Sequence, residues 1–125
     1  MGKNQEKVFM SQLFKLIDKE FSPVFQEWQW TYRWLSPFSF NNRTIECLTI
    51  TDHYQIEHKE VIINELILEI LVNLPPRMNP KTKHRQREIF VWEHIPNENQ
   101  EYRLVFWYDD NNSNALWIKN CYPID

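Results

Sequence analysis

The sequence predicts an α+β domain in which two amphipathic helices pack on an antiparallel sheet, in the order α-β-β-α-β-β-β. Apolar residues recur at spacings of three and four in two segments, as on one face of a helix, and they alternate or cluster in others, as in strands. A run of Asp and Asn at 109–114 separates the last two strand segments. The length of 125 residues and a hydrophobic content of 42% predict one folded domain over residues 1–125.

The first predicted helix covers residues 4–21. Its apolar positions follow a spacing of three and four, with Lys7, Lys15, Asp18 and Lys19 off that face, and they are Phe9, Leu13, Leu16, Ile17 and Phe21. Pro23 follows directly after Ser22, and a helix usually ends before such a pair.

Two strands are predicted next, over residues 28–34 and 44–51. In the first, Trp28, Trp30, Tyr32 and Trp34 alternate with polar residues, so all four share one face of a half-buried strand. Residues 36–42 read as a loop. The segment 44–51 is rich in β-branched residues, which favour strands.

The second predicted helix opens at Asp52, because Gln55 three residues later completes a capping box. Apolar residues at 62, 63, 66, 67, 70, 71 and 74 give it a wide buried face, and Pro75-Pro76 end it. Three more strands are predicted at Glu88–His94, Tyr102–Tyr108 and Ala115–Tyr122. Since Gly2 is the only glycine, Asn and Asp must supply left-handed turn residues.

Composition excludes several classes of site. A single glycine rules out the Gly-rich loops that bind phosphates in nucleotide-binding proteins. Cys47 and Cys121 lack metal-ligand spacing, so we interpret both as reduced structural thiols. The N-terminus does not resemble a signal peptide, and polar residues interrupt the apolar stretch 61–74. We therefore expect a cytoplasmic protein with no membrane partner.

The basic charge is concentrated in one predicted loop, residues 77–87. This loop carries five basic residues and no acidic one, although the chain has a net charge of −3. It could track an RNA backbone, or it could be an ordinary solvated loop. The candidate RNA-binding residues are Arg77, Lys81, Lys83, Arg85 and Arg87.

The histidines do not predict a metal site. His53 and His58 are five residues apart, which places them about 140° apart around a helix, whereas ligand pairs need a spacing of three or four. We expect no metal and no cofactor. His58 is either a hydrogen-bonded histidine at the edge of the core or a general acid or base, and His84 is the other candidate for proton transfer.

Arg103 and Lys119 are the only basic residues after position 87, and each lies within an apolar strand. They could face solvent as ordinary polar residues, or they could hold a phosphate from the open face of the sheet. The register of the hairpin decides between these alternatives, because a shift of one residue reverses the face.

The segment Tyr102-Arg-Leu-Val-Phe-Trp-Tyr108, followed by an Asp/Asn turn and Ala115-Leu-Trp-Ile-Lys-Asn-Cys-Tyr122, resembles the last two strands of the RelE and ParE toxin superfamily. The resemblance covers residues 44–122 and implies helices packed on a small antiparallel sheet. It also implies that Arg103 stabilises a scissile phosphate, with Lys119 and Tyr122 as further catalytic residues. The chain departs from the family in its low net basicity and in ending at Asp125.

Two functional hypotheses follow. The first is a toxin-like RNA-binding protein or metal-independent endoribonuclease, in which Arg103 binds phosphate, His58 or His84 moves protons, and the basic loop holds RNA. An antitoxin-like protein would then be a partner. The alternative is a non-catalytic protein-interaction module that uses the sheet edge and an exposed aromatic patch at Trp34, Phe38 and Phe40.

Overall fold

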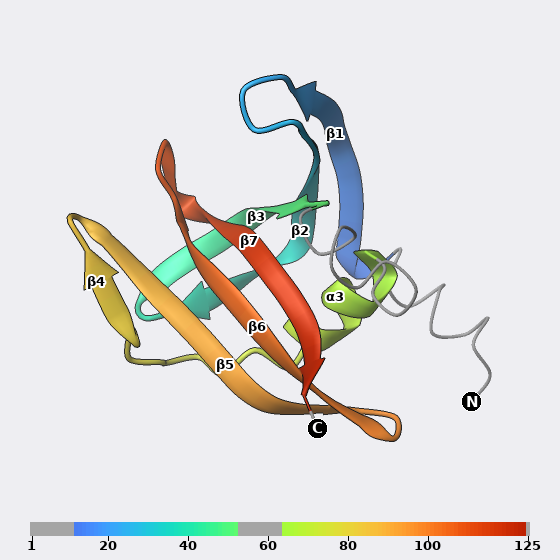
Figure 1. Cartoon of the computed structure of the whole chain (residues 1–125), viewed down its shortest axis with the longest axis vertical. Helices are drawn as coiled ribbons and strands as arrows, with labels where there is room; N and C mark the ends of the chain where they lie inside the picture. Colours follow the sequence, from blue (N-terminus) through green and yellow to red (C-terminus); the bar gives the residue numbers. More distant parts are fainter. Residues whose placement is uncertain (1–11, 53–63, 125) are drawn as a thin grey trace.

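The computed structural model describes residues 12–52 and 64–124, which form one strongly curled sheet and one short helix (Figure 1). Seven strands lie in the order β1-β2-β3-β7-β6-β5-β4. All neighbours are antiparallel except β3 and β7, which are parallel. The elements are β1 (Phe14–Ser22), β2 (Glu27–Phe40), β3 (Arg43–Thr51), α3 (Asn64–Leu71), β4 (Thr82–His84), β5 (Arg87–Asn97), β6 (Gln100–Asp109) and β7 (Asn112–Ile124).

The predicted fold class is wrong. The chain is mostly strand, and it forms a mixed sheet with one short helix instead of two helices on an antiparallel sheet. Within the predicted first helix, residues 14–21 belong to β1, which pairs with β2 from Phe14 to Ser22. A bulge between Leu16 and Asp18 changes which residues share a face. That change breaks the period of two and leaves apolar spacings that resemble those of a helix.

The predicted loop at 36–42 is also wrong over most of its length, since β2 continues to Phe40. Its pairing with β3 shifts register between Arg33 and Phe38, and Pro37 lies inside this shift. Proline has no N–H to donate, so an irregular stretch is where a strand accepts it. Only Asn41 and Asn42 form the turn, and both have the left-handed backbone expected of Asn.

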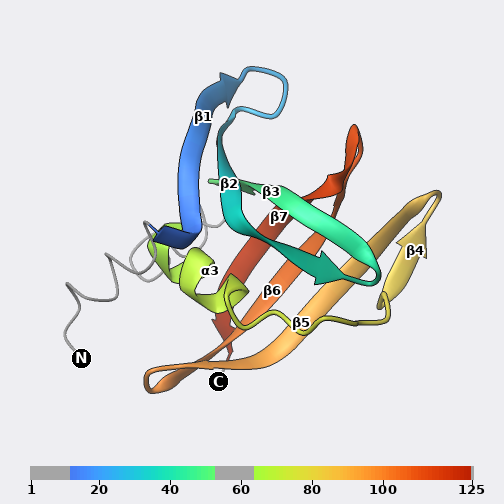
Figure 2. The ribbon, with the colours of Figure 1, turned by 180° about the vertical axis from the view of Figure 1, so that it is seen from behind.

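The second predicted helix is confirmed over Asn64–Leu71, which is α3. The predicted start at Asp52 and Gln55 falls in or beside residues 53–63, which lie outside the described residues. Four of the eight residues of α3 are buried: Ile67, Leu68, Ile70 and Leu71. Figures 1 and 2 show α3 inside the curl of the sheet, between the β1–β2 hairpin and strands β5–β7.

The last three predicted strands are confirmed, as β5, β6 and β7. Asp109 pairs with Asn112 at the predicted Asp/Asn turn, and the Asp109 side chain accepts a hydrogen bond from the Asn111 N–H at 2.8 Å. The basic loop contains the short strand β4. Positive φ angles also occur at residues whose Cβ makes them unfavourable, namely Gln26, Arg85, His94 and Glu98.

An aromatic cluster closes the curl of the sheet. The fully buried Phe40, at the end of β2, has its ring centroid 5.2 Å from that of Phe90 on β5 and 5.7 Å from that of Phe106 on β6. Next to it, Asn41 exchanges two 2.9 Å hydrogen bonds with the backbone of Met78. Strands far apart in the sheet order therefore meet face to face around Phe40.

Alternation assigns each strand residue to the inner or outer face of the sheet. Phe106 and Ile118 are buried inside, so their neighbours Trp107 and Trp117 point to the outer face, where the two residues pair directly across β6 and β7. Arg103 is on the same outer face, since Leu104 is buried inside. The candidate sites described below lie on this outer face and on the β1–β2 hairpin.

Candidate functional site

Arg103 is held by side chains of the sheet itself. Its guanidinium donates hydrogen bonds of 2.7 Å to the Glu93 carboxylate and 2.7 Å to the Tyr122 hydroxyl. These bonds raise the pKa of Arg103, and the bond from Arg103 lowers the pKa of Glu93. Two of the predicted catalytic residues, Arg103 and Tyr122, are thus brought together. The ion pair of Arg103 with Glu93 gives Arg103 a structural role, because the positive charge is already paired.

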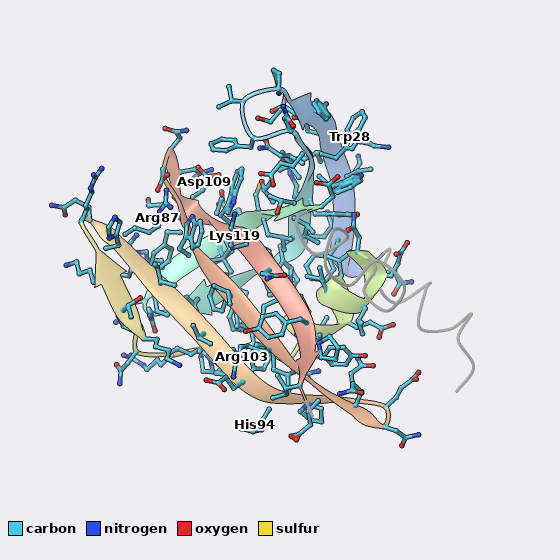
Figure 3. The ribbon with its side chains drawn as sticks, viewed as in Figure 1. Trp28, Arg87, His94, Arg103, Asp109 and Lys119 are labelled. Atoms are coloured by element: carbon cyan, nitrogen blue, oxygen red, sulfur yellow. The ribbon has the colours of Figure 1, made fainter. Side chains whose placement is uncertain are left out.

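The other predicted catalytic residues lie elsewhere. Lys119 is further along the outer face, near Asp109 and Arg87, whereas Arg103 is near His94 at the other end (Figure 3). His84 lines a separate pocket of about 710 Å³ between the β4–β5 and β6–β7 turns. His58 lies outside the described residues. Among the described residues, Arg103, Lys119 and His84 therefore do not come together at one site.

The predicted RNA-binding residues are spread along the edge of the sheet, and three of the five are engaged by the chain itself. Lys81 Nζ is 3.5 Å from Glu93 Oε1, and Arg77 donates a 3.1 Å hydrogen bond to Asn42. Arg87 forms an ion pair with Asp110 and covers the Trp107 ring at 4.4 Å. Lys83 on β4 and Arg85 at the β4–β5 turn are exposed. Two of the five positive charges, those of Lys81 and Arg87, are therefore paired with carboxylates.

Within residues 12–52 and 64–124, no group of three or more His, Cys, Asp or Glu side chains is arranged to hold a metal ion. In the same part of the chain, no helix is long and apolar enough to cross a membrane.

The predicted aromatic patch at 34–40 is not at the surface. Trp34 and Phe40 are 5% and 0% exposed, and Phe38 stacks on Trp34 with a centroid distance of 5.3 Å. The most exposed apolar side chains lie instead at the tip of the same hairpin. Val24 and Phe25 are 81% and 69% exposed at the turn between β1 and β2.

The rest of this surface continues along both strands of the hairpin. Phe21 and Trp28 are each more than 40% exposed and make an edge-to-face contact at 5.5 Å. Lys19 Nζ lies 5.0 Å from the Trp28 ring centroid. We call this surface the apolar hairpin, and its residues are Leu16, Ile17, Phe21, Val24, Phe25, Trp28 and Leu35.

A second pocket, of about 450 Å³, lies between the tip of the apolar hairpin and the outer face of β6 and β7. Trp107, Trp117 and Lys119 line it from the sheet, and Phe25 and Glu27 line it from the hairpin. Sequence reasoning missed this pocket, apart from Lys119 and Arg87, which also line it. The pairing of Trp107 with Trp117 depends on irregular register next to the turn, where Asp109 pairs with Asn112 but Tyr108 pairs with Leu116. An alternation pattern does not encode such a shift.

No protein-family model, curated protein or solved structure matches this chain. The functional conclusion therefore depends on the geometry of the hairpin, the edge of the sheet and the outer face.

Proposed function

We propose that this protein is a non-catalytic protein-interaction module, and that the apolar hairpin is its docking surface. The observation that carries the proposal is the concentration of exposed apolar side chains. Among the described residues, every large hydrophobic side chain that is strongly exposed lies between Leu16 and Leu35, in β1, β2 or the turn between them. Exposed apolar side chains gathered on one hairpin are typical of protein-binding sites. We place the protein in the cytoplasm, where free Cys47 and Cys121 would stay reduced.

The edge strand β1 supports the same proposal. β1 is the terminal strand of the sheet, and among the described residues it pairs only with β2. An edge strand offers backbone N–H and C=O groups to an incoming strand. Seven consecutive residues of β1, from Lys15 to Phe21, are exposed. We infer that a partner adds a strand to β1 and covers the apolar side chains beside it.

A different protein fits this edge better than a second copy of the chain. Two copies of β1 paired antiparallel around a two-fold axis must place one residue opposite its own copy. In registers centred on Asp18, Lys19 or Glu20, that residue is charged. Like charges directly opposite each other destabilise a strand pair. The partner therefore supplies a strand of different sequence, with apolar residues to cover Phe21 and Trp28.

Substitution of Val24 by Glu should break the docking while leaving the fold intact, because Val24 is 81% exposed. A charge at the centre of an apolar interface costs about 2 kcal/mol or more, so we expect partner affinity to fall at least about 30-fold. The partner would be isolated with the wild-type chain and its Kd measured by calorimetry. Lys83→Glu, on the opposite edge strand β4, is the matched control and should bind normally.

Hydrogen exchange of the complex separates strand addition from other modes of binding. We expect the amides of β1 to gain protection when the partner binds, and those of β4 to stay unchanged. Protection at β4 instead of β1, or a Val24→Glu variant that binds as tightly as the wild type, would contradict the proposal. A stable dimer of the isolated chain that Val24→Glu dissociates would show that the occupant is a second copy.

The endoribonuclease hypothesis has less support, because Arg103 is paired with Glu93 and the candidate proton-transfer group His84 lies in a different pocket. We expect messenger RNA incubated with ribosomes and the purified chain to remain intact, and Arg103→Gln to behave identically. RNA cleavage that Arg103→Gln abolishes would establish the nuclease and refute a non-catalytic role. RNA binding without cleavage that requires Lys83 and Arg85 would show that the basic turn, not the apolar hairpin, carries the function.

A further inference from the structure

We propose that the pocket between the hairpin tip and the outer face of β6 and β7 binds a small neutral saccharide. This site is independent of the protein-docking surface, although Phe25 borders both. Its volume of about 450 Å³ falls in the range of small-molecule sites, which combine apolar walls with a few polar groups.

The floor of the pocket is aromatic. Trp107 and Trp117 are directly opposite each other on neighbouring strands and both are half-buried on the outer face. Side chains of opposed residues in an antiparallel pair are close neighbours, so the two indoles lie side by side, and the Arg87 guanidinium lies over the Trp107 ring. The exposed Phe25 lines the pocket from the hairpin. A ligand with a flat apolar face can therefore lie between Trp117 and Phe25.

Glu27 adds a carboxylate to the lining of the pocket. The residue is 8% exposed, and no described residue forms a hydrogen bond or ion pair with its carboxylate. Its two oxygens can accept from two hydroxyl groups of a ligand.

The charges of the pocket disfavour an anionic ligand. Asp110 is paired with Arg87, which leaves the charges of Glu27, Asp109 and Lys119. These sum to −1, so a phosphate would be repelled. Lys119 and Glu27 offer one donor group and one acceptor group, and neither has an ion-pair partner among the described residues.

A saccharide ring meets these requirements together. It presents C–H groups on one face, which suit the indole floor, and hydroxyl groups around its edge, which both donate and accept hydrogen bonds. Glu27 would accept from ring hydroxyls and Lys119 would donate to them. The ion pair of Arg87 with Asp110, and Asn111 beside it, would form the polar rim.

The six tryptophans provide the readout, since each indole N–H gives one signal in a nitrogen–proton correlation spectrum. The wild-type chain would be titrated with glucose, galactose, mannose and N-acetylglucosamine, and separately with adenosine monophosphate and tetramethylammonium. We expect at least one saccharide to shift the Trp107 and Trp117 signals and to leave Trp28, which lies outside the pocket, unchanged. The signals are assigned by single Trp→Phe variants.

Two variants test the roles of the lining residues. Glu27→Gln removes the charge with little change of shape and should weaken saccharide binding about tenfold, whereas Trp117→Ala should abolish it. Val24→Glu, which does not line the pocket, should bind the saccharide normally, so the outcome does not depend on the protein-docking proposal. Shifts with adenosine monophosphate or tetramethylammonium but with none of the sugars would overturn the proposal. Saccharide binding unaffected by Glu27→Gln and Trp117→Ala, or no shift with any probe, would also overturn it.

Discussion

Substitution of Phe40 by Ala should lower the free energy of unfolding by about 3–5 kcal/mol, a large fraction of the stability of a domain of this size. Phe40 is fully buried, and its ring contacts Phe90, Phe106 and Tyr108. Its removal would leave a cavity where β2 meets β5 and β6, and these strands are not neighbours in the sheet. Denaturation by urea, followed by circular dichroism, measures the loss.

Phe25→Ala is the matched control for this measurement. It removes the same side chain from the hairpin tip, where Phe25 is 69% exposed, and we expect a change within about 0.5 kcal/mol. Equal effects of the two substitutions would show that Phe40 does not close the curl of the sheet.

The protein should lose stability as the pH rises above about 9, and buried Cys121 is the main reason. Burial raises the pKa of this thiol from 9.0 to about 12. Between these values the unfolded chain releases a proton that the folded chain retains, so rising pH favours unfolding. The slope for one proton is about 1.4 kcal/mol per pH unit, or about 4 kcal/mol across the interval. Urea denaturation at successive pH values measures this slope.

Cys121→Ala should reduce the loss of unfolding free energy with rising pH between pH 9 and 10, whatever its effect on absolute stability. Above pH 10 a smaller decline should remain, since burial also raises the pKa of Tyr32, Tyr102 and Tyr108. Cys47→Ala is the control: burial raises its pKa as well, but the residue is only partly buried, so the slope should change less. A slope that Cys121→Ala leaves unchanged would contradict the assignment.

The sequence predicted the second half of the chain better than the first. Strands β5, β6 and β7 contain short apolar runs separated by Asn- and Asp-containing turns, so the local sequence pattern located them. The prediction for β1 was wrong for two reasons. Its bulge at Leu16–Asp18 disrupts the alternation, and its exposed apolar side chains have the spacing of the buried face of a helix. Periodicity reports spacing along the chain, and it does not report which face is covered.

The sites were predicted less well than the strands, because their residues come together through long-range register. The sequence pattern indicates no partner for Arg103, whereas the pairing of β5 with β6 places Glu93 beside it. The predicted aromatic patch was assigned to the correct hairpin but to its buried end, Trp34 and Phe40, instead of its exposed tip. Glu27 and Trp117 come from opposite ends of the chain, and only the three-dimensional fold brings them to one pocket.

The parallel ladder between β3 and β7 also has a consequence for how the chain folds. Strands β1–β3 form one antiparallel meander and β4–β7 form another, each closed by short turns between successive strands. The two are joined where Cys47–Ile50 pairs with Ala115–Ile118, across more than half of the sequence. Closing so long a loop costs conformational entropy, and this cost comes before the contacts between β3 and β7 can offset it. We therefore expect the docking of two locally formed meanders to limit the folding rate, with the apolar inner face of each meander exposed until docking is complete.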